Sequence, residues 1–293
     1  SINGEYSVNE IANIFTGIET GADSIYILKA NDPTLEKFNY PNNKLIYPVL
    51  KGADLNRFSF ESKKQYVIMP YKDKRNLFDI ENEIKSENHY LYDYLISNKS
   101  ELEQRNKGKM KGDAWYSYVY PKNLFKYNKT RLIWSDISKR PQFSIDYENN
   151  WHVRTVCSLD LKEEFNFIDY KVLLLIFNST LFEYFVINNS NAIRGGYLRY
   201  RPQYIKEFKI PDLKKINQNP FISSADSMIS FTEGFQELNN KFQNYIEQKF
   251  QLEKLNRKLQ NWHELEFGDF IKELNKAVKT SNKQRLKDNL QEV

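Results

Sequence analysis

Residues Asp169–Ile187, DYKVLLLIFNSTLFEYFVI, form a strongly apolar segment of the chain. The repeated apolar positions predict a helix, with its members at Val172, Leu173, Ile176, Leu181, Phe182 and Phe185. Because apolar side chains surround this helix on almost every side, we expect it deep in a core. A helix buried in this way needs other elements around it, and the flanking sequence supplies them.

Short runs rich in β-branched and aromatic residues precede this helix, with turn sequences between them. They predict strands at Ser24–Leu28, Lys44–Leu50, Gln65–Tyr71, Arg131–Ser135 and Gln142–Ile145. A second helical pattern covers His89–Arg105. The first ~210 residues therefore predict an α+β fold.

The composition of the 293 residues limits the class of protein. The chain has 43 Lys+Arg against 38 Asp+Glu (net charge +5), and it is 40% hydrophobic with 10 Gly and 9 Pro. These values exclude collagen-like, linker and fully disordered chains. No run approaches the ~18 apolar residues of a membrane span, so we expect a cytoplasmic protein with no membrane partner. The single cysteine, Cys157, excludes an internal disulfide framework and any multi-thiolate zinc site.

The pattern of residues changes after Pro211 and becomes that of long helices. Asn217–Pro220 resembles a linker, and Ser223 or Ser224 is expected to cap a helix that continues to Trp262. This helix of roughly 35–40 residues carries a coiled-coil-like apolar seam through Met228, Phe231, Phe235, Leu238, Phe242 and Tyr245. A shorter helix at Asp269–Lys279 is expected to fold back onto it. We therefore predict two domains, residues 1–215 and 216–293.

Motifs of the common enzyme classes are absent from the sequence. It has no G-x-G-x-x-G after a strand, no Walker loop, no G-x-S-x-G elbow and no N-P-P-Y/F or D-P-P-Y/F tetrapeptide. Cys157 has no histidine near it in sequence and is interpreted as a small core residue. Glu207-Phe208-Lys209 and Glu247-Gln248-Lys249 lack the further metal-binding Asp of a nuclease. We expect no catalytic residue, metal site or cofactor in this chain.

The positive charge is concentrated in two places. Lys122–Arg140 holds six cations against Asp136, and Val186–Ile210 holds five against Glu207, which gives local charges of +5 and +4. Within the second, RGGYLRYRPQY (Arg194–Tyr204) combines three arginines, three tyrosines and a Gly-Gly pair. Such glycines allow close backbone approach, and arginine suits phosphate or guanine. Nucleic-acid contact and an ordinary solvated basic turn both remain open from these residues alone.

Seven loose motifs follow one another between Val8 and Pro211. They are Ile14–Tyr26, Pro48–Phe58, the strand ending in Pro70-Tyr71, the helix with Leu102–Arg105 leading to Trp115-Tyr116, Asp136–Pro141, Leu173–Phe185 containing Asn178-Ser179, and Arg194–Tyr204 closing on Ile210-Pro211. In this order they resemble the TaqI-like C-terminal specificity domain of adenine-specific DNA methyltransferases, a module of type II restriction–modification enzymes that include nuclease fusions.

This resemblance implies twisted β-sheets with a few helices and a non-catalytic role in sequence-specific recognition of double-stranded DNA. A separate N-terminal domain would bind S-adenosylmethionine and methylate a flipped adenine. The DNA-binding candidates are Lys51, Arg57, Ser138, Lys139, Arg140, Arg194, Gly195, Gly196, Tyr197, Arg199 and Arg201. Ala53 stands where many relatives have a basic or polar residue, so Lys51 and Arg57 are expected to bear more of that loop's role.

Two other functions compete with this interpretation. The chain resembles half of a type I specificity subunit, which would recruit separate methylase subunits, and it could be a protein-interaction scaffold without DNA binding. The apolar seam must pack on something, either within the same polypeptide or in a homodimer. Since the chain begins at Ser1 rather than Met, we expect it to be the recognition end of a larger enzyme.

Overall fold

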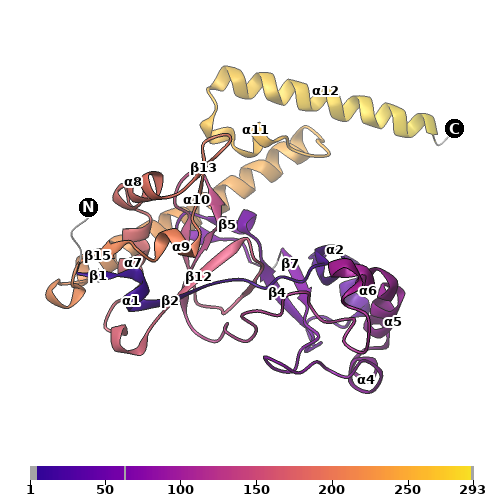
Figure 1. Ribbon diagram of the computed structural model, residues 1–293. Helices are drawn as coiled ribbons and strands as arrows, with labels where there is room; N and C mark the ends of the chain where they lie inside the picture. The colour runs from indigo at the N-terminus through magenta and orange to yellow at the C-terminus, as the bar shows by residue number, and fades with distance from the viewer. Residues whose placement is uncertain (1–4, 63, 292–293) are drawn as a thin grey trace. The chain divides into compact units, whose positions relative to one another are not determined.

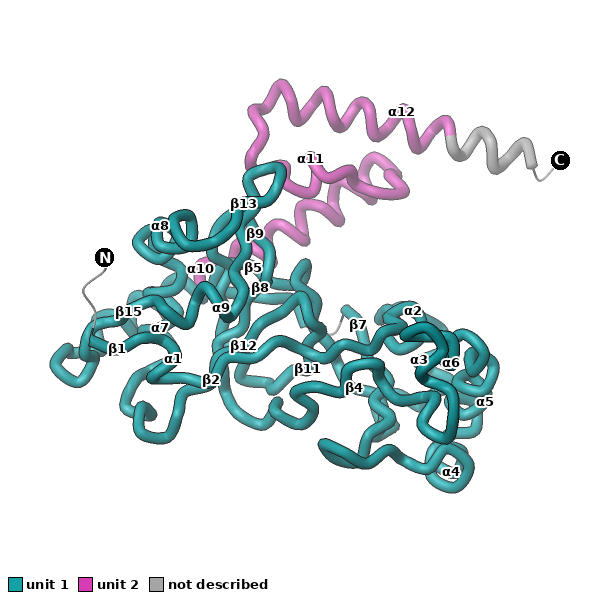
Figure 2. Tube along the Cα trace, viewed as in Figure 1, with its two compact units in different colours: residues 1–229 teal, residues 230–293 magenta. Residues whose placement is uncertain are grey.

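The computed structural model describes residues 5–62 and 64–291 and has the α+β fold that the sequence predicts (Figure 1). The chain forms two compact units, Ser1–Ile229 (unit 1) and Ser230–Val293 (unit 2), coloured separately in Figure 2. The division falls inside the long helix α10 (Asn219–Lys249). The domain boundary expected after residue 215 stays a prediction.

One antiparallel sheet of unit 1 has the strand order β10-β8-β12-β2. Its strands are β2 (Ala12–Thr16), β8 (Arg131–Ser135), β10 (Phe143–Asp146) and β12 (Val156–Leu161). In β8, Leu132 and Trp134 join the core that contains α7, whereas Ile133 joins a separate small cluster. Successive side chains of a strand point to opposite faces, so burial on both faces explains why β8 is apolar without alternation.

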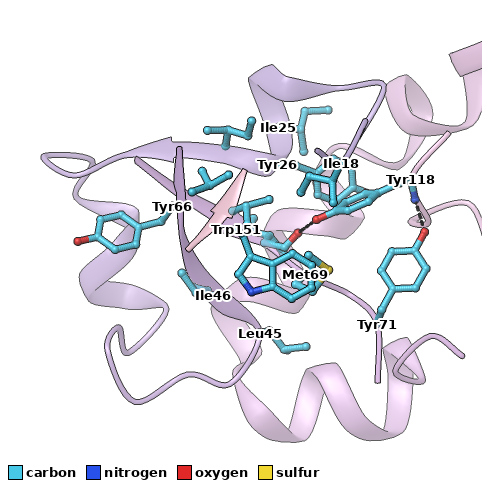
Figure 3. Packing of buried hydrophobic residues seen from close by; sticks show 14 of the residues in the cluster. Ile18, Ile25, Tyr26, Leu45, Ile46, Tyr66, Met69, Tyr71, Tyr118 and Trp151 are labelled. Atoms are coloured by element: carbon cyan, nitrogen blue, oxygen red, sulfur yellow. Dashed lines mark hydrogen bonds between the residues drawn. The ribbon is translucent and has the colours of Figure 1, made fainter. Parts of the chain in front are cut away.

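A second sheet of unit 1 has the order β11-β4-β7-β3, with β11 parallel to β4. Its strands are β3 (Ile27–Lys29), β4 (Ile46–Leu50), β7 (Gln65–Ile68) and β11 (Trp151–His152), and α5 (His89–Ser97) and α6 (Lys99–Gly108) belong to the same lobe. Its core combines aromatic side chains such as Tyr26, Tyr118 and Trp151 with aliphatic ones, as Figure 3 shows. The Tyr118 hydroxyl donates to the Ile68 carbonyl (2.6 Å), and its ring lies 5.1 Å from that of Tyr26. Buried tyrosines thus satisfy their polar ends within the sheet.

Short elements complete unit 1. They are β1 (Tyr6–Ser7), β5 (Leu55–Asn56), β6 (Ser59–Phe60), β9 (Ile137–Ser138), β13 (Ala192–Ile193), β14 (Tyr197–Arg199), β15 (Lys209–Ile210), α1 (Val8–Ile11), α2 (Asp23–Tyr26), α3 (Thr34–Lys37), α4 (Lys85–Glu87) and α9 (Pro202–Ile205), with 3-10 or π turns at Gly52–Asp54, Ile80–Ile84, Glu163–Phe165 and Leu213–Lys215.

The strand expected at Ser24–Leu28 is wrong in its first half. The Ala22 carbonyl accepts from the amides of Ile25 and Tyr26 (both 3.0 Å), which closes a helical turn there.

The single helix expected over Asp169–Ile187 is instead two helices, α7 (Tyr170–Phe177) and α8 (Thr180–Asn189), bent by 59°. Asn178 causes the break, because its side chain exchanges hydrogen bonds with the backbone of Phe143 in β10 (3.1 and 3.0 Å). Ser179 then caps α8 by accepting from the Phe182 amide (3.2 Å). Burial on nearly all sides holds for α7 only, since Tyr184 of α8 is 64% exposed.

Among the described residues, no single helix is long and apolar enough to span a membrane, although α7 and α8 taken together meet those criteria despite their bend.

The predicted helix from Ser223 to Trp262 is wrong at both ends. It begins at Asn219, so Ser223 and Ser224 lie inside α10, and it ends at Lys249. Gln251 has a φ of +50°, which turns the chain back, and the Asn256 side chain caps the short α11 (Arg257–Gln260) by accepting from the Leu259 amide (3.0 Å).

Unit 2 has a small core of its own. The helix expected at Asp269–Lys279 is longer, α12 (Phe267–Gln291), and follows a 3-10 turn at Trp262–Glu264. It folds back as expected, and the core contains Ile246, Leu252, Leu255, Leu259, Leu274 and Ala277. Along the predicted seam of α10, Phe242 packs on Trp262 (ring centroids 4.3 Å apart), whereas Phe231 is 73% exposed. What covers the rest of the seam stays a prediction.

The last residue of β11, His152, is fully buried. His152 bonds through Nε2 to the Ser158 hydroxyl, and its Nδ1 has no hydrogen-bond partner among the described residues. A Cβ on Gly17 would lie 2.4 Å from that Nδ1 and 2.0 Å from the His152 carbonyl, so only glycine fits there. Burial, helped by the charge of Arg131, lowers the pKa of His152 to about 3.

This depressed pKa predicts an acid-sensitive fold. The unfolded chain binds a proton at His152 below pH ~6.5 and the folded chain does not, so stability is complete above pH 6.5 and falls as the pH drops towards 3. Urea titrations should show the free energy of unfolding to be about 2 kcal/mol lower at pH 5 than at pH 7. His152→Asn should remove most of this difference, and an unchanged pH dependence in that variant would contradict the assignment.

Candidate nucleic-acid interface

Two basic segments about 60 residues apart in sequence meet in one small sheet. Its order is β13-β14-β9, and β14 pairs antiparallel with β9 so that Leu198 lies opposite Ser138 and Arg199 opposite Ile137. Leu198 is buried beneath the strand, whereas Arg199 is half-buried at its surface. The sheet therefore places the Lys139-Arg140 loop beside the arginine-rich segment that ends at Arg201.

The β13–β14 hairpin projects an exposed turn made of Arg194, Gly195 and Gly196. Both glycines adopt positive φ angles, +89° and +77°, which other residues rarely tolerate. Space around Gly196 is open, so its backbone is accessible to a partner. Next to the turn, the Lys139 ammonium lies 5.6 Å from the centre of the Tyr197 ring. The hairpin thus presents the Arg194 cation and the exposed backbone of two glycines, with Lys139 of the neighbouring loop beside its Tyr197 ring.

The Lys51 turn joins this group from another part of the chain. The Gly52 amide donates to the Thr155 hydroxyl (3.0 Å), and the Thr155 carbonyl accepts from the Asp136 amide (2.9 Å). A Cβ on Gly52 would lie 2.7 Å from the Ser135 hydroxyl oxygen. The glycine therefore lets the turn that carries Lys51 lie against the end of β8, where the Asp136–Arg140 loop begins.

A cleft of about 590 Å³ opens beside Arg201. Its lining residues are Thr16, Asp136, Arg154, Arg201, Pro202, Gln203 and Lys206. Burial raises the pKa of Asp136, and the neighbouring charges of Arg201, Arg154 and Arg199 oppose that shift. Guanidinium donors beside a carboxylate acceptor match the two kinds of hydrogen-bonding group on base edges.

Sequence reasoning did not single out Arg154 and Lys206 as site residues. Lys206 was visible as part of the local charge of +4, whereas Arg154 occupies an isolated turn between β11 and β12 without any sequence signal. Its side chain is 63% exposed, with an ion-pair distance of 3.5 Å to Glu19.

Two of the predicted DNA contacts are engaged with the α7–α8 junction. Arg57 donates to the Asn178 carbonyl, and Arg140 pairs with Glu183 of α8 (3.3 Å). Burial lowers the pKa of Arg57, the like charge of Arg140 lowers it further, and Glu183 opposes both. Arg57 and Arg140 thus form a second cationic group around one carboxylate.

Ser138 has a local role in the structure. It is 4% exposed, and its hydroxyl donates to the Arg140 carbonyl (2.6 Å) within the turn that follows β9. The DNA contacts assigned to Ser138 and the other candidates stay predictions. No group of three or more His, Cys, Asp or Glu within the described ranges is arranged to hold a metal ion.

Unit 1 is thus an α+β module that brings loop-borne cations from three segments of the chain together. The family described as "TaqI-like C-terminal specificity domain" matches residues 47–210, more than half of the 293. The chain belongs to this family, which confirms the resemblance stated above. Residues 214–292 match a family described only as a domain of unknown function, DUF8810.

Two relatives are type II methyltransferases. The chain is 20% identical over 216 residues to M.BstVI of Geobacillus stearothermophilus, covering 69% of this chain and 34% of that protein. It is 23% identical over 207 residues to M.XhoI of Xanthomonas vasicola, covering 68% of this chain and 34% of that protein. The chain spans about a third of the length of these relatives.

A solved structure has a similar fold. It is that of the type IIL restriction–modification enzyme MmeI in complex with DNA, with a TM-score of 0.53 and 11% sequence identity over 95% of this chain and 33% of that chain. At this identity the likeness extends to the fold alone.

Proposed function

We propose that this chain is a sequence-specific DNA-recognition module of a restriction–modification methyltransferase. The observation that carries the proposal is the pairing of β14 with β9, which brings the Lys139-Arg140 loop beside Arg199 and the segment that ends at Arg201. Arginine can bind guanine with two hydrogen bonds in the major groove, and lysine and exposed backbone amides bind phosphate. The family and the two methyltransferase relatives support the same function.

In this proposal the module positions a duplex for chemistry carried out elsewhere. Methylation of a flipped adenine, and the S-adenosylmethionine that supplies the methyl group, belong to a catalytic region in the same polypeptide or in a separate methylase subunit. Arg199, Arg201 and Asp136 would contact base edges, because two guanidinium donors and a carboxylate acceptor are half-buried near one another. Lys51, Lys139 and Arg194 would contact phosphates.

Salt dependence tests this proposal. Fluorescence anisotropy with a labelled duplex should give a logarithmic slope of affinity against salt steeper than about −3, since each phosphate contact contributes roughly −0.9. A protein-interaction scaffold would show no binding or a flat salt response. Either of those results would exclude the DNA-recognition function.

A further inference from the structure

A second basic cavity shares Lys206 with the Arg201 cleft. It has a volume of about 520 Å³ and adjoins β2 through Ala12, Asn13, Ile14 and Phe15. Five lysines line it: Lys74, Lys126, Lys129, Lys162 and Lys206. We call this cavity the lysine basin. Among its described lining residues Asp160 is the one carboxylate, and Arg131, which also lines it, is already paired with Asp146.

The lysines of the basin differ from eight other lysines of unit 1 that form ion pairs. Ion pairs within 4.0 Å involve Lys44, Lys64, Lys72, Lys85, Lys99, Lys171, Lys209 and Lys215. Within the described part of the chain, none of the five basin lysines pairs with a carboxylate at that distance. Like charges gathered in one concavity repel one another, so the folded unit carries an electrostatic cost there that a bound anion would offset.

Two of the five lysines are held in place by their surroundings. The Lys162 ammonium donates to the carbonyls of Asn9 and Glu10 (2.9 and 2.8 Å), and the Lys126 ammonium lies 5.1 Å from the centre of the Phe15 ring. Neither contact neutralises the charge. The basin therefore presents positioned positive charge to whatever occupies it.

The basin is continuous with the proposed DNA-recognition surface. Lys206 lines both the basin and the cleft beside Arg201 and Asp136. Strand β2 runs between them, with Ile14 and Phe15 in the basin and Thr16 in the cleft. A basic track thus extends from Arg201 through Lys206 to Lys126 and Lys129.

We propose that the lysine basin binds the phosphodiester backbone of the DNA beyond the base pairs that the arginine surface recognises. This inference rests on the proposed function. Phosphodiester oxygens only accept hydrogen bonds, and the lining supplies ammonium donors together with the side-chain amides of Asn9, Asn13 and Asn128. Among the described lining residues five lysines stand against one carboxylate, Asp160. This excess of cations suits the uniformly charged backbone, so we assign the basin no sequence preference of its own.

The test compares the full chain with two variants of equal charge. Lys74→Gln, Lys126→Gln and Lys129→Gln together remove three basin charges, and Lys29→Gln, Lys37→Gln and Lys109→Gln remove three exposed charges outside it. In anisotropy titrations across a range of salt, the basin variant should bind on the order of tenfold more weakly at low salt, with a salt slope smaller by roughly 2 to 3. The control variant should match the wild type in slope.

The dependence of affinity on duplex length distinguishes the contribution of the basin from that of the recognition surface. Wild-type affinity should fall once the flanking DNA on one side no longer reaches the basin, whereas the basin variant should show no such step. Equal slopes in the basin variant and the wild type, or the same length step in both, would overturn this inference while leaving the proposed function intact. Absence of salt-dependent binding by the wild type would instead reject the proposed function.

Discussion

Asp146→Ala should lower the free energy of unfolding of unit 1 by about 3–5 kcal/mol, because it leaves a buried guanidinium without its partner. Arg131 and Asp146 are 1% and 0% exposed, and Arg131 Nη2 lies 2.6 Å from Asp146 Oδ2. Burial raises the pKa of Asp146 and lowers that of Arg131, in each case against the attraction of the partner. The pair has thus already lost its hydration, and deleting one charge leaves the other uncompensated.

A matched surface pair gives the control for this variant. Lys85 and Glu81 lie 3.5 Å apart on an exposed surface of the same unit, and Glu81→Ala should cost less than about 1 kcal/mol. Urea titrations monitored by tryptophan fluorescence measure both variants, since the fully buried Trp134 lies in β8, the same strand as Arg131. A loss below about 1 kcal/mol in Asp146→Ala would show that Arg131 finds other compensation, for example from the Asn150 carbonyl.

Replacing Arg194, Arg199 and Arg201 together with alanine should weaken DNA binding about a hundredfold or more. Each arginine that contacts a base or phosphate contributes on the order of 1–3 kcal/mol, and 1.4 kcal/mol corresponds to a factor of ten. None of the three forms an ion pair within 4.0 Å in the described ranges, so truncation breaks no such pair. Titration of a labelled duplex, with a melting curve to verify folding, measures the effect.

A second set of variants distinguishes base contacts from phosphate contacts. Arg199→Lys with Arg201→Lys keeps the charge but removes the planar fork that binds guanine with two hydrogen bonds. If these arginines recognise bases, the lysine variant should keep the salt slope and lose discrimination between cognate and unrelated duplexes. Unchanged discrimination would assign them to phosphates, and unchanged affinity in the alanine variant would place the interface elsewhere.

The class of fold and the family could be predicted from the sequence, because strand patterns and the individual motifs are each formed by residues that are close together in the chain. β8 (Arg131–Ser135) is found where it was expected, and Gly195 and Gly196 form a turn that exposes their backbone. The α7–α8 break was not predicted, because it depends on Asn178 bonding to Phe143, a residue 35 positions away. The end of α10 at Lys249 was missed for a similar reason, since Leu252 and Leu259 pack back on Ile246.

Cations show the limit of sequence reasoning most clearly. Arg131 and Lys126 belong to one basic segment in the sequence, yet Arg131 is buried in an ion pair and Lys126 lines a cavity. Arg105 is also buried, donating to the carbonyls of Leu102, Thr20, Trp115 and Ser117. Only the pairing of distant strands reveals which positive charges share a surface, and this is why Arg154 and Lys206 were overlooked.

We propose that this chain recognises a particular DNA sequence by itself. Selection of bound duplexes from a pool with a randomised centre, at a salt concentration that suppresses non-specific binding, tests it most directly. The proposal predicts that one short motif becomes enriched with the wild type and is lost with the Arg199→Lys, Arg201→Lys variant. Retention of DNA without enrichment of any motif, or no retention at all, would contradict it.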